Sequence, residues 1–170
     1  MSDDAALTVL EGGKPISFGF KDLMRYHGHG FPGGVAHAFT AMRAAFPLLD
    51  GGELLERREI TVRTAFGGPG GHDALEMVTR GRSEGRQHKV PELAEPQRGT
   101  TLQNYVWEFT YRGTTATVHV AEGIVRDEFI ALGKKPDRTA AEEERLEWLK
   151  QDMAQRILSL PAHEVYTPVA

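Results

Sequence analysis

The sequence predicts an α+β fold, an antiparallel sheet packed with helices, from two kinds of periodicity. Residues 58–66 alternate apolar and polar side chains, as a half-buried strand does. Residues 105–120 hold two alternating runs on either side of a turn at 112–114, which predicts a hairpin. Apolar residues recur every three or four positions over 35–49 and 139–160, which predicts two long helices. Neighbouring antiparallel strands mixed with helices are typical of α+β proteins.

Weaker patterns predict the remaining elements. Thr139 and Glu142 form a capping-box pattern at the start of the second long helix. The other expected elements are short helices at 18–26, 72–78 and 124–132, an edge strand or ordered arm near 7–10, a loop at 87–100 and an irregular tail. We therefore expect one domain over residues 1–170, with an N-terminal arm at 1–15 and a C-terminal tail at 161–170.

The composition excludes several classes of protein. The 170 residues are 40% apolar, which is enough for one core without a structural metal or disulfide. The absence of cysteine excludes disulfides, iron–sulfur clusters and thiol nucleophiles. A net charge of −4, with both signs interspersed, makes nucleic acid an unsuitable partner. Since no apolar run approaches a membrane span and none follows the acidic first residues, we expect a cytoplasmic protein without a membrane partner.

The strongest candidate site is the run YHGHGFPG at residues 26–33. One glycine separates His27 from His29, so the backbone can bend and both imidazoles can converge. The run precedes the helix at 35–49, whose N-terminus carries free N–H groups. Neutral imidazole is the commonest metal ligand, although histidines bonded to a turn give the same pattern. His37 falls off the apolar stripe of the helix, so we expect it to be exposed or at the edge of the site.

The order of motifs resembles the FmdE-like family, which is named after a component of formylmethanofuran dehydrogenase. In that family His-Gly-His is followed by Cys-Pro-Gly and an apolar helix; here residues 26–34 lead into the helix at 35–49. The family's Asp-Ala helix start is similar to residues 73–74, its glycine turn to 79–86, and its aromatic hairpin to 105–120. The resemblance covers about residues 16–165 and implies an FmdE-like core and a homodimer.

The chain departs from this family at each of its cysteines. Phe31 and Arg82 stand where the family has the cysteines of Cys-Pro-Gly and of the glycine turn. Glycines and His72 stand where a further cysteine precedes the Asp-Ala pair, and the zinc ribbon of longer relatives has no counterpart. The resemblance therefore implies either a lost metal site or one rebuilt from nitrogen and oxygen ligands.

A rebuilt site would use His27, His29 and His72 as metal ligands. Three protein ligands with an open position are the pattern of catalytic sites, and a divalent Zn, Fe, Ni or Mn ion there would polarise a carbonyl or activate water. Haem with an axial histidine is the alternative cofactor. His72 is otherwise an acid–base group or a loop histidine. Asp73 either orients a histidine or acts as a base, or it caps the following helix.

The glycine-rich segment at 67–71 and nearby arginines form a candidate anion site. The backbone N–H groups of Gly70 and Gly71 would meet a phosphate or carboxylate at a helix start. Arg82 and Arg86 would pair with that anion. A flexible loop beside solvated charges is the alternative interpretation, and the Gly-Lys-Ser/Thr of a P-loop does not follow.

Three functions follow from these candidates. The leading hypothesis is a metal-dependent enzyme acting on a polar small molecule that bears a carbonyl or carboxylate. The second is a non-catalytic protein that binds a metal, haem or another cofactor. The third is a metal-free enzyme that uses histidine acid–base chemistry.

Overall fold

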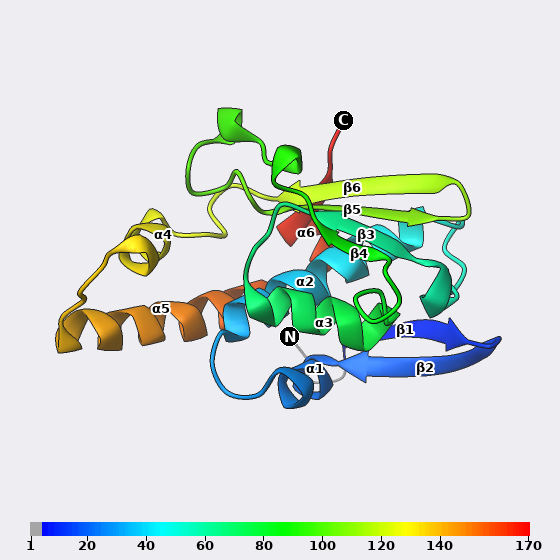
Figure 1. Ribbon diagram of the computed structural model, residues 1–170, viewed down its shortest axis with the longest axis horizontal. Helices are drawn as coiled ribbons and strands as arrows, with labels where there is room; N and C mark the ends of the chain where they lie inside the picture. Colours follow the sequence, from blue (N-terminus) through cyan, green and yellow to red (C-terminus); the bar gives the residue numbers. More distant parts are fainter. Residues whose placement is uncertain (1–4) are drawn as a thin grey trace.

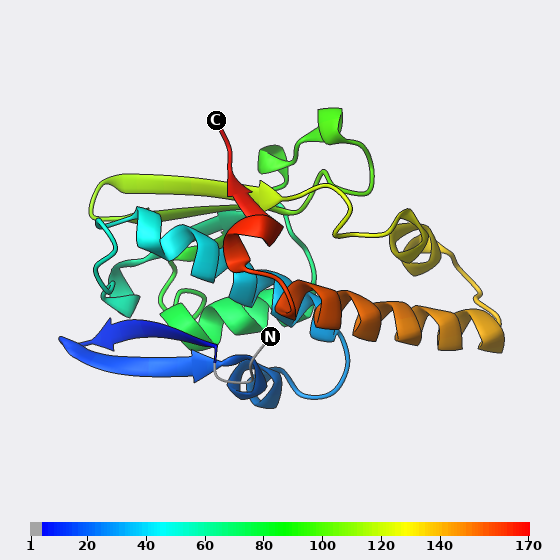
Figure 2. The same ribbon diagram turned by 180° about the vertical axis from the view of Figure 1, so that it is seen from behind.

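Two sheets and six helices make up residues 5–170, the part of the chain that this computed structural model describes (Figure 1). The five-stranded sheet forms one layer. Helices α2 (Pro32–Ala45) and α3 (Pro69–Thr79) lie against it, and α1 (Phe20–His27) and the two-stranded sheet lie on the far side of these helices (Figures 1 and 2). The α+β class is therefore confirmed.

The larger sheet has the strand order β4–β3–β5–β6–β7. In that order its strands are Gln87–Lys89, Thr61–Thr64, Val106–Tyr111, Thr114–Val120 and Tyr166–Pro168. The predicted hairpin is confirmed as β5–β6, with Trp107 opposite Val118. Strands β3 and β4 run parallel while the other neighbours are antiparallel, so the expected antiparallel sheet is in fact mixed.

Both edge strands lie where the sequence predicts irregular structure. Strand β4 has no apolar alternation, and it pairs because the flanking backbone is bonded to β3: Val62 N donates to Arg86 O and Val90 N to Thr64 O. Strand β7 follows the short helix α6 (Ala162–Val165), and the burial of Tyr166 holds it against β6. The loop expected at 87–100 and the irregular tail at 161–170 are therefore corrected.

The N-terminal arm is a hairpin of β1 (Ala6–Glu11) and β2 (Lys14–Gly19). Gly12 and Gly13 both take positive φ, 58° and 80°, which is the conformation a tight two-residue turn requires. Leu7, Val9 and Phe18 are buried against the helices. The single edge strand or arm expected at 1–15 is therefore two paired strands; the first four residues lie outside the described range.

Helix α2 is the centre of the molecule. It contacts α3, α5 and α6 and lies against the sheet, so it is buried on nearly all sides. The periodic stripe predicted its inner face correctly, but His37 and Thr40, which fall off that stripe, are also buried. A helix surrounded by protein has no solvent face to carry polar residues. The expectation that His37 is exposed is therefore wrong.

Helices α4 (Asp127–Lys134) and α5 (Ala140–Leu158) project from one end of the molecule (Figure 1). The predicted capping box is confirmed, because Thr139 Oγ1 accepts from Glu142 N at 3.1 Å and the Glu142 carboxylate accepts from Thr139 N at 2.9 Å. The predicted stripe of α5 packs against α2. Within residues 5–170, no helix is long and apolar enough to cross a bilayer.

Helix α3 begins at Pro69, three residues before the predicted start. Proline suits the first helical position, and the glycines that follow allow α2 and α3 to approach closely. A Cβ on Gly34 would lie 3.2 Å from Gly71 N. Asp73 therefore lies in the second turn of α3 rather than at its N-cap, and its carboxylate is directed sideways toward α1.

Candidate functional site

Three side chains form a linked set that we call the His27 group: His27, Asp73 and Arg82. His27 lies in the last turn of α1, and its Nδ1 donates to Asp73 Oδ2 at 2.8 Å. Arg82 Nη2 donates to Asp73 Oδ1, also at 2.8 Å. Burial opposes ionisation of Asp73, but the bonds from His27 and Arg82 together outweigh it and lower its pKa. Asp73 is thus an anion that fixes the tautomer and orientation of the His27 ring.

The other ring nitrogen of His27 is buried and without a partner. Its Nε2 has no hydrogen-bond partner among residues 5–170, although only 8% of the side chain is exposed. In the neutral ring with Nδ1 as the donor, Nε2 presents a lone pair. A Cβ on Gly70 would lie 3.3 Å from Nε2, so this atom lies against the first turn of α3. Buried polar atoms are rarely left unpaired, and an exception marks a candidate functional atom.

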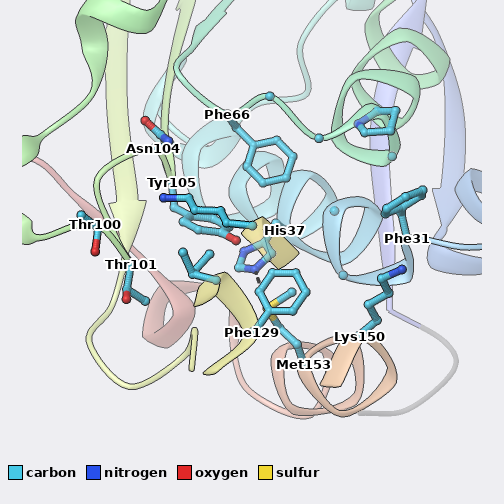
Figure 3. Close-up of a pocket in the computed structure, with 18 residues that line it drawn as sticks. Phe31, His37, Phe66, Thr100, Thr101, Asn104, Tyr105, Phe129, Lys150 and Met153 are labelled. Atoms are coloured by element: carbon cyan, nitrogen blue, oxygen red, sulfur yellow. Dashed lines mark hydrogen bonds between the residues drawn. The ribbon is translucent and has the colours of Figure 1, made fainter. Parts of the chain in front are cut away.

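A cavity of about 280 Å³ lies next to two neighbours of the His27 ring, although no member of the His27 group lines it. Phe31 and Gly70 line the cavity and also border the His27 ring: a Cβ on Gly70 would lie close to Nε2, and the two ring centroids of His27 and Phe31 are 6.4 Å apart. The wall is formed by the starts of α2 and α3, the segment before β5, and residues of α4 and α5 (Figure 3). This volume lies at the lower end of the range for small-molecule sites.

Phe31 occupies an unusual position in this wall. It precedes α2 with φ 46° and ψ 44°, a left-handed conformation that is uncommon for a residue with a side chain. Its ring is half exposed, and the ammonium of Lys150 lies 4.5 Å from the ring centroid. Phe31 therefore places an aromatic ring next to both His27 and the cavity.

His37 forms part of the inner wall of the cavity, which agrees with the second of the two expectations for it, a place at the edge of a site. Its Nε2 lies 3.3 Å from Met153 Sδ, which only accepts, so Nδ1 accepts from the Tyr166 hydroxyl at 2.8 Å. Burial lowers the pKa of His37 to about 3, and the charge of Arg156 adds to that effect. His37 is therefore a neutral, fully bonded part of the wall, and its ring lies 4.6 Å from that of Tyr105.

The three expected metal ligands are not brought together. His29 is exposed. His72 Nε2 donates to Phe66 O at 2.7 Å, and its Nδ1 accepts from Gln87 at 3.1 Å, so both of its nitrogens are bonded within the protein. Across residues 5–170, no group of three or more histidine or carboxylate side chains is arranged to hold a metal ion. Of the residues singled out from the sequence, His27 and Arg82 are instead both bonded to Asp73.

The expected anion site is also rearranged. Arg86 donates to Ile60 O at 2.5 Å and Thr79 O at 2.9 Å, so its guanidinium joins β3 to the end of α3. Gly71 serves close packing, since a Cβ there would lie 2.7 Å from the Phe66 ring. Gly70 does line the cavity, and Arg82 belongs to the His27 group. The sequence could not distinguish these roles of the glycines and arginines, because each role depends on which distant element packs against residues 67–86.

No protein-family model matches the chain, and no curated protein matches it. The resemblance to the FmdE-like family therefore stays a prediction based on the order of motifs. The function is inferred from the His27 group and the nearby cavity.

Proposed function

We propose that the protein is an enzyme that moves a proton on a small molecule bearing a carbonyl or carboxylate, with His27 as the acid–base group. The observation that carries this proposal is the unpartnered, buried Nε2 of His27 next to Phe31 and Gly70, two residues that line a cavity. A histidine held by a carboxylate on one nitrogen and free on the other is the arrangement that general acid–base catalysis needs.

Each member of the His27 group has a distinct role in this proposal. His27 Nε2 accepts a proton from the carbon next to a substrate carbonyl; the C–H electron pair stays on the substrate as an enolate. The imidazolium that forms is stabilised by the Asp73 anion 2.8 Å from Nδ1. Arg82 holds the other oxygen of Asp73 and keeps that carboxylate ionised. Asp73 and Arg82 are positioning residues; return of the proton completes the reaction.

The metal-dependent alternative fits these residues less well. A carboxylate also stands behind many metal-binding histidines, so the His27–Asp73 pair by itself suits a ligand. A catalytic zinc site, however, needs three protein ligands, and the described residues supply no such group around His27 Nε2. Elemental analysis of untagged protein tests for Zn, Fe, Ni or Mn, and a Soret band tests for haem. Both cofactors, and a homodimer, stay predictions.

The acid–base proposal is tested by hydrogen exchange. The protein is incubated in D₂O with a panel of 2-oxo acids, ketones and carboxylates, and loss of substrate C–H signals is followed by NMR. His27→Gln is expected to lower the exchange rate by at least about 100-fold, the usual contribution of a general base. Asp73→Asn is expected to lower it too, because the ring loses its orienting anion.

His29→Gln is the matched control, since it removes an exposed histidine from the same turn. Its exchange rate should equal that of the unaltered protein. Equal loss in the His27 and His29 variants, together with stoichiometric metal, would instead favour the metal site. Exchange that survives His27→Gln would overturn the proposal.

A further inference from the structure

We infer that the cavity binds a small aromatic monocarboxylate, with its carboxylate at the Lys150 end and its ring among Phe66, Tyr105 and Phe129. This deepens the proposed function by naming a substrate class, and it rests on that proposal only in taking the cavity as the substrate site. The inference combines the charge of the cavity wall, its aromatic walls, its size and the position of His27.

The charges around the cavity are positive. Lys134 and Lys150 line it, and none of the described residues in its wall is aspartate or glutamate. Only 18% of the Lys150 side chain is exposed, and the nearest carboxylate oxygen, on Glu147, is 3.7 Å away. This partly desolvated ammonium has only a long ion pair, to a carboxylate that is itself 57% exposed, and so favours an anionic ligand.

Two helix starts add to this potential. The first turns of α2 and α3 reach the cavity through Gly33, Gly34 and Gly70, and neither helix has a side-chain cap. Their free N–H groups and dipoles favour negative charge. The buried, unpartnered Nε2 of His27 lies against the same turn of α3 and is an unsatisfied polar atom there, although His27 does not line the cavity.

Three aromatic side chains form a large part of the rest of the wall. Figure 3 shows Phe66, Tyr105 and Phe129 around the cavity, with Lys150 beside Phe31 at one end. The Phe66 ring stacks on Trp107 at 5.0 Å and lies 5.3 Å from Tyr105, so its position is set by its neighbours. Offset and edge-on contacts of this kind suit an aromatic ligand. The cavity volume of about 280 Å³ matches one ring with a short acid side chain.

The positions of Phe31, Lys150 and His27 also determine the orientation of the ligand in the cavity. Phe31 and Lys150 mark one end of the cavity, and His27 lies directly behind Phe31 and Gly70. A ligand with its carboxylate at this end therefore has its carboxyl group and the adjacent carbon nearer to His27 than its ring. Tyr105 contributes a hydroxyl from the other side; burial raises its pKa, so it remains a neutral donor.

Binding is measured by NMR chemical-shift titration and calorimetry with three probes: phenylacetate, phenylacetamide and acetate. Phenylacetate is expected to bind at least about tenfold more tightly than either of the others, since the amide lacks the charge and acetate lacks the ring. Lys150→Met should weaken phenylacetate binding by about tenfold and leave phenylacetamide unchanged. Lys14→Met, at an exposed lysine on the distant β1–β2 hairpin, is the control and should change nothing.

If phenylacetate and phenylacetamide bind equally well, the inferred carboxylate site is wrong. If acetate binds as well as phenylacetate, the inferred aromatic site is wrong. No binding of any probe would overturn the whole inference. These comparisons use the unaltered protein, so they hold even if Lys150→Met fails to fold. Phenylacetate binding without exchange in D₂O would refute the proposed activity alone, whereas His27-dependent exchange of neutral ketones without phenylacetate binding would refute this inference alone.

Discussion

Acidification from about pH 8 to about pH 5 is expected to destabilise the folded protein through His37. The imidazole is fully buried, and this burial, with the charge of Arg156, lowers its pKa from 6.5 to about 3. Both ring nitrogens are bonded in the neutral form, one accepting from Tyr166 and the other donating to Met153. The folded state therefore resists protonation, while the unfolded chain does not.

The magnitude follows from the two pKa values. The unfolded state takes up a proton near pH 6.5 and the folded state only near pH 3, so between these values the unfolded state binds one more proton. The contribution of His37 to stability is thus complete above about pH 6.5 and is lost as the pH falls. One pKa unit is about 1.4 kcal/mol, so the loss is about 2 kcal/mol near pH 5 and about 5 kcal/mol below pH 3.

Urea denaturation at several pH values measures this loss. His37→Gln removes the titrating group, so the difference in free energy of unfolding between the two proteins isolates His37 from every other ionisable residue. That difference should fall by about 2 kcal/mol between pH 8 and pH 5. His29→Gln, at an exposed position, should follow the unaltered protein. Parallel curves for the unaltered protein and His37→Gln would refute the assignment of His37 as a buried neutral imidazole.

Three further changes test the packing by urea denaturation. Gly71→Ala is expected to lower the free energy of unfolding by about 1–3 kcal/mol, because a Cβ there would lie 2.7 Å from an aromatic ring. The control Gly133→Ala has nothing within 4 Å of the new Cβ and should be neutral or stabilising. Equal effects of the two substitutions would contradict this reasoning. Arg57→Ala should lower the free energy of unfolding by about 2–4 kcal/mol, since this buried side chain donates to two carbonyls at the end of α3. The control Arg63→Ala, at an exposed arginine, should change stability by less than about 1 kcal/mol. A small loss for Arg57→Ala would show that these two bonds do not stabilise the fold. Thr139→Ala should cost about 1 kcal/mol and speed amide exchange in the first turn of α5, and unchanged exchange there would show that the cap is dispensable.

The candidate site was only partly predictable from the sequence. His27 and Asp73 stood out because of a glycine-flanked histidine and a helix start, and they are bonded to each other. Their partnership could not be read from the chain, since 46 positions separate them and α1 must pack on α3 to join them. His72 has the same residue type as His27, but the carbonyl of Phe66 and the amide of Gln87 occupy both of its nitrogens.

The sequence by itself determined the elements whose periodicity reports a half-buried surface: the β5–β6 hairpin, the inner face of α2 and the capped helix α5. These patterns are local, because side chains two, three or four positions apart share a face of one element. Only the tertiary structure decided the edge strands β4 and β7, the burial of His37 and the hydrogen-bond partners of His27 and His72. Each of these depends on backbone or side-chain partners brought from distant segments, and local periodicity carries no information about which segments meet.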